Sequence, residues 1–153
     1  MKKIGFIGLG NMGKGMSINL AKENHKIIGY DINHITYDYF KDQDVLIAEN
    51  LNSLMNESEI IITMLPDGSA VEKVWSEIIN YSKPNQYLID CSTIDVKTSI
   101  KMQMQAKKKG LFTLDAPVSG GVIGADQGTL TFMVGGNSDV YNDIKFLFEI
   151  MGK

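Results

Sequence analysis

A serine and a pair of glycines follow a largely apolar segment late in the chain, residues 111–114. The connecting residues 115–118 lead directly to Ser119, Gly120 and Gly121. In an open α/β sheet, ligands bind beyond the ends of the strands, and consecutive backbone N–H groups can hold a small anion without a cationic side chain. We therefore predict that this serine and the two glycines bind a small carboxylate.

A second glycine-rich pattern, of the form G-x-G-x-x-G, lies near the start of the chain. It consists of Gly8, Leu9, Gly10, Asn11, Met12 and Gly13. The pattern ends a strand-like segment and opens a helix-like one, which is the context that a dinucleotide-binding turn requires. The first glycine permits a tight turn, the second admits a pyrophosphate to the backbone, and the third allows helix and strand to pack closely. The N–H groups at the start of the helix would then face the phosphates.

Asp31 closes the second predicted strand, 18 residues beyond Gly13. A carboxylate at this place can accept hydrogen bonds from an adenosine ribose, and it would repel a 2′-phosphate. The next residues, Ile32, Asn33 and His34, include neither Arg nor Lys to neutralise such a phosphate. The pattern therefore favours NAD over NADP. The alternative interpretation is a structural turn and an ordinary acidic strand end.

Two further strand ends carry candidate residues. Leu65-Pro66 follows the fourth predicted strand, where a proline either shapes the wall of a nucleotide cleft or simply terminates the strand. Met64 lies beside it and could also approach the cofactor. Thr93 follows the fifth predicted strand, so its hydroxyl could meet the nicotinamide carboxamide or the substrate. It could equally cap the next helix, which is a common role for threonine.

Composition narrows the function classes. The chain has 153 residues, which fits one domain, and a net charge of −3, which gives no reason to expect nucleic acid or an anionic membrane as partner. All its basic residues are Lys, so no guanidinium can clamp a carboxylate. Cys91 is the single cysteine, with inert packing as its expected role, and His25 and His34 show no metal-ligand spacing. No signal peptide is expected ahead of the first strand, and we predict a cytoplasmic location.

Strand-like and helix-like segments alternate along the chain. The expected strands are residues 3–8, 26–31, 45–48, 59–65, 86–91, 111–115 and 129–134. The expected helices are residues 11–22, 50–56, 69–81, 95–109 and 138–151, with Asp95 as a helix N-cap. The glycine-rich residues 120–128 are expected to form a loop. Strands separated by helices predict an α/β fold of the Rossmann type, with a doubly wound, mostly parallel sheet.

Four segments together resemble a known family. They are IGFIGLGNMG at 4–13, ITMLP at 62–66, DCSTID at 90–95 and DAPVSGGVIGADQGTLTFMVGG at 115–136. In this order they are similar to the N-terminal NAD-binding domain of the 3-hydroxyisobutyrate dehydrogenase family, the β-hydroxyacid dehydrogenases. The resemblance implies oxidation of 3-hydroxyisobutyrate to methylmalonate semialdehyde with NAD, a step of valine catabolism. The related tartronate semialdehyde and glyoxylate reductases are the closest alternatives.

The resemblance also assigns roles to residues. Ser119, Gly120 and Gly121 would bind the substrate carboxylate and hydroxyl, in agreement with their interpretation as an anion-binding loop. Ala70 would join the cofactor contacts at the start of its helix. The candidate cofactor-binding residues are then Gly8, Leu9, Gly10, Asn11, Met12, Gly13, Asp31, Asn33, Met64, Leu65, Pro66, Ala70 and Thr93.

One part of the family pattern has no counterpart in these residues. Family members continue into an all-helical C-terminal domain for substrate binding and dimerisation, whose first long helix carries a catalytic Lys followed four residues later by an Asn. No Lys here, Lys153 included, occupies that motif. We therefore expect residues 1–153 to form the dinucleotide-binding domain, to lack a catalytic residue and to be inactive alone. A homo-oligomer is expected, and a non-catalytic dinucleotide-binding or assembly module is the second hypothesis.

Overall fold

The structure is a computed structural model that describes residues 1–153, apart from the side chains of residues 35 and 36. Its strands are β1 (Lys3–Ile7), β2 (Lys26–Tyr30), β3 (Val45–Ile47), β4 (Ile60–Thr63), β5 (Tyr87–Asp90), β6 (Phe112–Asp115), β7 (Val118–Ser119), β8 (Thr131–Phe132) and β9 (Gly135–Gly136). Its helices are α1 (Asn11–Lys22), the 3₁₀-helix η1 (His34–Phe40), α2 (Leu51–Glu57), α3 (Gly68–Tyr81), α4 (Val96–Lys108), α5 (Gly121–Gln127) and α6 (Ser138–Met151).

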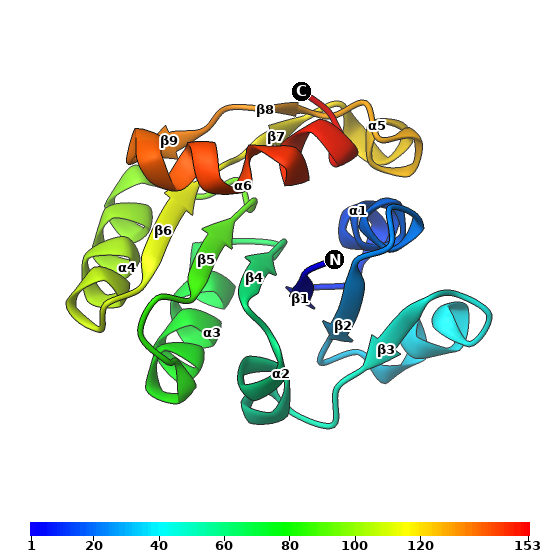
Figure 1. Ribbon diagram of the computed structural model, residues 1–153, viewed down its shortest axis with the longest axis horizontal. Coiled ribbons are helices and arrows are strands. Elements are labelled where there is room, and N and C mark those ends of the chain that lie inside the picture. Colours follow the sequence, from blue (N-terminus) through cyan, green and yellow to red (C-terminus); the bar gives the residue numbers. More distant parts are fainter.

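The main sheet has the strand order β3-β2-β1-β4-β5-β6-β9 (Figure 1). The first six of these strands are all parallel to their neighbours, and only β9 is antiparallel, to β6. This order is that of a doubly wound α/β fold, in which the winding reverses between the first and fourth strands. The structure thus confirms the predicted Rossmann-type fold, and it places the reversal between β1 and β4.

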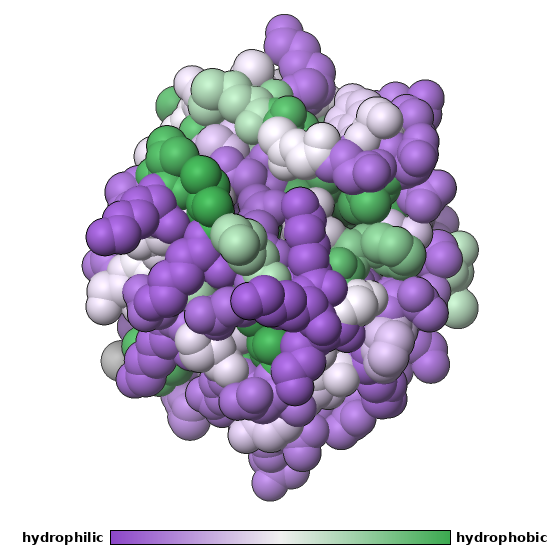
Figure 2. All heavy atoms as spheres, turned by 90° about the vertical axis from the view of Figure 1, so that its left-hand side faces the viewer, coloured by the Kyte–Doolittle hydropathy of each residue, from purple (hydrophilic) through white to green (hydrophobic). Residues whose placement is uncertain are grey.

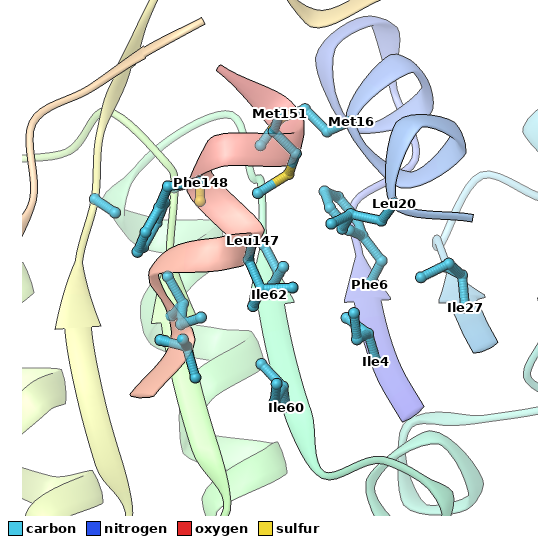
Figure 3. Close-up of a cluster of buried hydrophobic side chains, with 14 of the residues drawn as sticks. Ile4, Phe6, Met16, Leu20, Ile27, Ile60, Ile62, Leu147, Phe148 and Met151 are labelled. Carbon is cyan, nitrogen blue, oxygen red and sulfur yellow. The ribbon is translucent and has the colours of Figure 1, made fainter. Parts of the chain in front are cut away.

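Helices cover both faces of this sheet, as the unbroken apolar run of β4 requires. Ile60 and Ile62 point into the hydrophobic cluster beneath α1 and α6, whereas Ile61 points into the cluster beneath α2, α3 and α4. Figure 3 shows the first cluster, in which Leu147 of α6 lies next to Ile62 of β4. Period-two alternation along one apolar strand therefore fills two separate cores.

The segment between β6 and α6 differs from the prediction. Residues 129–134 were expected to form a seventh strand of the sheet, but β8 pairs antiparallel with β7 in a separate two-stranded sheet. Residues 120–128 were expected to form a loop, but they contain the helix α5. Glycine-rich sequence argues against a helix, yet α5 packs closely on α1, and that tertiary contact outweighs the low helix propensity.

The surface is mostly hydrophilic. Figure 2 views the side of the molecule that carries α4 and shows hydrophobic side chains as separate patches among hydrophilic ones. Val96, Ile100 and Met104 of α4 are among the exposed apolar residues. Within the described residues, every helix is too short or too polar to cross a bilayer.

Candidate cofactor and substrate site

The loops that follow β1, β2 and β4 meet at the point where the winding of the sheet reverses. Gly8 has a φ of 95°, and its N–H donates to the carbonyl of Tyr30 at 2.9 Å. A Cβ on Gly8 would lie 2.2 Å from the carbonyl oxygen of Met64. The turn after β1 thus requires glycine both for its backbone angle and for the closeness of the β4 loop.

Gly10 and Gly13 have opposite surroundings. A Cβ on Gly10 would meet nothing within 4 Å, whereas a Cβ on Gly13 would lie 1.8 Å from the carbonyl oxygen of Gly8. Gly10 is the N-cap of α1 and makes no side-chain cap hydrogen bond, so the first N–H groups of this 12-residue helix face free space. The donor set and the space fit a pyrophosphate, because a helix N-terminus attracts anions.

Asp31 joins the loop after β2 to the glycine-rich turn. Its Oδ2 accepts a hydrogen bond of 2.7 Å from the N–H of Leu9, and its Oδ1 accepts one of 2.7 Å from the N–H of Asn33. The Tyr37 hydroxyl donates to the Asp31 carbonyl at 2.6 Å. Each carboxylate oxygen keeps a second acceptor position, because a carboxylate offers about four lone pairs. Asp31 is therefore held in place and can still accept hydrogen bonds from a ribose.

The loop after β4 is joined to the loop after β5. Leu65 donates its N–H to the Ser92 hydroxyl at 2.9 Å. This bond joins the loops that carry Pro66 and Thr93 at the carboxyl ends of two neighbouring strands. Asp95 caps α4 by accepting from the N–H of Thr98 at 2.9 Å. Of the two roles open to Thr93, capping α4 is thus taken by Asp95, and the Thr93 side chain is exposed.

The start of α3 is closed by its own cap. The Asp67 side chain accepts from the N–H of Ala70 at 2.8 Å. The backbone donor of Ala70 is therefore used inside the helix, and only the half-buried Ala70 methyl group remains to contact a ligand.

A buried polar cluster lies beneath these loops, and the sequence analysis predicted no role for its residues although two of the family segments contain most of them. Asp90 is 3% exposed, and its Oδ1 accepts hydrogen bonds from the hydroxyls of Thr63 at 2.8 Å and Ser92 at 2.6 Å. The Ser92 N–H donates to the same oxygen at 3.1 Å, and the Trp75 indole N–H donates to the Thr63 hydroxyl at 3.0 Å. Burial raises the pKa of Asp90 to about 6, against the lowering effect of the Ser92 and Thr63 hydrogen bonds.

Ser119 ends β7, and Gly120 and Gly121 lead into α5, which lies beside α1 (Figure 1). Ser119 is exposed, and its strand pairs it with Thr131 of β8. Gly120 and Gly121 have φ values of 131° and 63°, and a Cβ on Gly121 would meet nothing within 4 Å. The loop therefore exposes the Ser119 hydroxyl and leaves free space beside Gly121, whereas Gly120 lies close to Leu130.

Helix α5 ties this loop to the cofactor turn. The Asn19 side chain of α1 donates to the carbonyl of Ala125 at 2.8 Å, and a Cβ on Gly15 would lie 2.7 Å from the Ala125 carbonyl carbon. The helices α1 and α5, which start at the two glycine-rich turns, thus lie in direct backbone contact.

Cys91 is completely buried next to these loops. Burial, together with the nearby Asp90 and Asp115 carboxylates, raises the pKa of its thiol well above the ordinary value. A buried thiol of this kind is inert, as expected from its position in an apolar strand. No group of three or more His, Cys, Asp or Glu side chains among the described residues could hold a metal ion.

Comparison with known proteins identifies the domain. Residues 3–153 match the family model of the NAD binding domain of 6-phosphogluconate dehydrogenase. The probable mitochondrial 3-hydroxyisobutyrate dehydrogenase of Dictyostelium discoideum is 41% identical over 99% of this chain and 48% of its own length. The NAD-dependent L-serine dehydrogenase of Pseudomonas aeruginosa is 36% identical over 100% of this chain and 52% of its own.

A solved structure agrees with these relatives. The 3-hydroxyisobutyrate dehydrogenase of Mycobacterium tuberculosis, solved with L-serine, superimposes with a TM-score of 0.96 at 36% identity, over 99% of this chain and 52% of that one. The chain thus spans about half the length of the relatives that it matches. It belongs to the NAD-binding domains of the 6-phosphogluconate dehydrogenase type and, within them, to the N-terminal NAD-binding domains of the 3-hydroxyisobutyrate dehydrogenase family.

Proposed function

We propose that this chain is the cofactor half of a dehydrogenase that oxidises 3-hydroxyisobutyrate to methylmalonate semialdehyde. One observation carries the proposal: the turn around Gly10 is hydrogen-bonded to the Asp31 carboxylate after β2, and the helix α1 that starts at this turn packs against α5, which starts at the Ser119–Gly121 loop (Figure 1). This arrangement offers an anion site at each end of a cleft, with room for a dinucleotide in between.

Each candidate residue has a role in this proposal. The turn from Gly8 to Gly13 takes the pyrophosphate, and Asp31, with Leu9 and Asn33 holding its carboxylate, takes the ribose. The remaining cofactor contacts come from Met12, Met64, Leu65, Pro66, Ala70 and Thr93. Bound NAD supplies the hydride acceptor, and the protein holds it in position.

The Ser119–Gly121 loop binds the substrate. The backbone N–H groups of Gly120 and Gly121 hold its carboxylate, which needs no Arg, and the Ser119 hydroxyl orients the substrate. A 3-hydroxy carboxylate places its reacting carbon a short, fixed distance from the anchored carboxylate. L-serine is also a 3-hydroxy carboxylate, and both the serine dehydrogenase relative and the solved structure with L-serine support this substrate class.

The proton of the substrate hydroxyl needs an acceptor that these residues do not provide. None of the 15 basic residues lies in a Lys-x-x-x-Asn pattern. We therefore propose that the acceptor comes from outside residues 1–153, and that the chain binds NAD without appreciable turnover. General acid–base catalysis typically contributes about 10²–10⁴-fold to a rate.

The test uses the purified 153-residue chain. Calorimetry with NAD and with NADP should show binding of NAD, with NADP weaker by about tenfold or more because Asp31 repels a 2′-phosphate. Formation of NADH from 3-hydroxyisobutyrate should be negligible. An ordinary turnover rate would disprove the external proton acceptor, and absence of dinucleotide binding would disprove the cofactor site.

The reading frame that follows Lys153 separates the two function classes. A continuation with a Lys-x-x-x-Asn helix supports the dehydrogenase, and the longer protein should then have a higher kcat/KM for 3-hydroxyisobutyrate than for L-serine. A stop codon supports a non-catalytic module. We also propose a homo-oligomeric state, which ultracentrifugation would measure. A cytoplasmic location is a further proposal, and it differs from the Dictyostelium relative, which is described as mitochondrial.

A further inference from the structure

Asp90 ends β5 directly below the proposed nicotinamide end of the cleft, yet it is too deeply buried to touch a cofactor. It lies opposite Thr63 of β4 in the parallel register. A single oxygen, Oδ1, accepts all three of its hydrogen bonds, from the Thr63 hydroxyl and from the hydroxyl and N–H of Ser92.

The hydrogen bonds continue from Asp90 in two directions. Toward the core, the Thr63 hydroxyl accepts from the indole N–H of Trp75, a residue of α3 that is 1% exposed. Toward the cleft, the Ser92 hydroxyl accepts from the N–H of Leu65. Because Ser92 donates its hydroxyl proton to Asp90, the oxygen lone pairs are left for the Leu65 N–H. Oδ1 of Asp90 thereby orients the Ser92 hydroxyl so that it accepts the hydrogen bond from the Leu65 N–H, which joins the β4 and β5 loops.

A buried carboxylate is a costly means of stabilising a fold. Well-packed apolar side chains often replace buried charged groups without loss of stability. Buried ionisable groups with shifted pKa values occur preferentially at functional sites. Asp31 makes the analogous connection at the other end of the cleft, between the β1 and β2 loops, but it is partly exposed and can touch the ligand itself.

We propose that Asp90 is a positioning residue of the cofactor site, which acts through Ser92 to hold the Leu65-Pro66 loop against the Ser92-Thr93 loop. The bond holds the two walls of the nicotinamide end at a constant separation before the cofactor binds. This inference rests on the proposed placement of the cofactor. It predicts that the network matters for the nicotinamide half of the dinucleotide and not for the adenosine half.

The experiment compares NADH with ADP-ribose, which lacks the nicotinamide, by calorimetry on the 153-residue chain. Ser92→Ala should weaken NADH binding about tenfold, as loss of a hydrogen bond to a charged group would, and should change ADP-ribose binding less than about twofold. Asp90→Ala should act in the same direction. Asp90→Asn keeps an acceptor oxygen and should restore most of the NADH affinity.

Thr113→Val is the matched control. The Thr113 hydroxyl is also buried and donates to the Gln103 side chain at 3.0 Å, but it lies in β6 away from these loops. The control should lower the melting temperature without changing the ratio of the two affinities.

Two results would overturn the inference. One is a Ser92→Ala variant that binds both ligands as wild type does or weakens both equally, because a merely structural role predicts no difference between them. The other is a wild-type chain that binds neither ligand, which would also overturn the cofactor site. Since Ser92→Ala removes only one oxygen, this variant keeps the test valid even if Asp90→Ala does not fold.

Discussion

The cofactor turn and the substrate loop are both rich in glycine, but their glycines serve different physical purposes. In the turn after β1, Gly8 and Gly13 are surrounded by backbone atoms that leave no room for a Cβ. In the substrate loop, Gly121 has free space around it and only its positive φ favours glycine. The first region is preformed by packing within this domain, whereas the second is an exposed surface. This difference supports the proposal that the chain contains a complete cofactor site and only part of a substrate site.

Gly13→Ala should produce the largest effect. A Cβ there would lie 1.8 Å from a backbone oxygen, so α1 would have to move away from β1. Overpacking typically costs 1–3 kcal/mol, and with a backbone atom as the obstacle we expect a loss of about 3 kcal/mol or more. Urea denaturation would measure it. A stability equal to wild type would show that the turn is not packed as described.

Gly10→Ala should separate binding from folding. Its φ of −70° suits alanine and its Cβ would meet no protein atom, so the melting temperature should remain within a few degrees of wild type. The methyl group would occupy the space proposed for the pyrophosphate, and we expect NADH affinity to fall about 100-fold, since close backbone approach is the reason for glycine here. Unchanged NADH binding in calorimetry would rule out this place for the phosphates.

The buried Asp90 should give the cofactor region a pH-dependent stability. Its pKa is raised to about 6 in the folded state, above the ordinary value, so the folded chain holds this proton more tightly than the unfolded chain. The extra stability is present at low pH and is lost as the pH rises from 4 through 6, by about 3 kcal/mol in total. Asp90→Asn should remove this contribution, so the difference between the two proteins in urea denaturation should vary with pH by that amount. A constant difference would contradict the raised pKa.

Gly121→Ala should have the smallest effect. The residue has a φ of 63° but no neighbour for a Cβ, so only backbone strain of about 1 kcal/mol is expected. NADH affinity should stay within about twofold of wild type, because the substrate loop does not take the nucleotide. A large loss of NADH affinity would show that the two regions are not independent. Gly10→Ala is the positive control, since it is expected to lose NADH affinity.

The fold of the cofactor half could be predicted from the sequence because its determinants are local. The helix α1 has the expected bounds, Asn11–Lys22. The unbroken apolar run that forms β4 predicted a strand covered on both faces. The glycine spacing and Asp31 likewise predicted a cofactor turn, and the structure joins the two through the hydrogen bond from the Leu9 N–H to Asp31. Such signals need only neighbouring residues and the periods of helix and strand.

Tertiary contacts alone decided the rest. The helix in the glycine-rich residues after Gly120 depends on packing against α1, whose Asn19 is far away in the sequence, and the strand after this helix pairs with β7 rather than with the main sheet. The Asp90 network depends on a serine hydroxyl that reaches Leu65, 27 residues earlier in the chain. A hydrogen bond between distant residues leaves no periodic pattern in a single sequence. The amino-acid order thus determined the sheet and the cofactor turn, and the packing of β4, β5 and α3 determined how the walls of the cleft are held together.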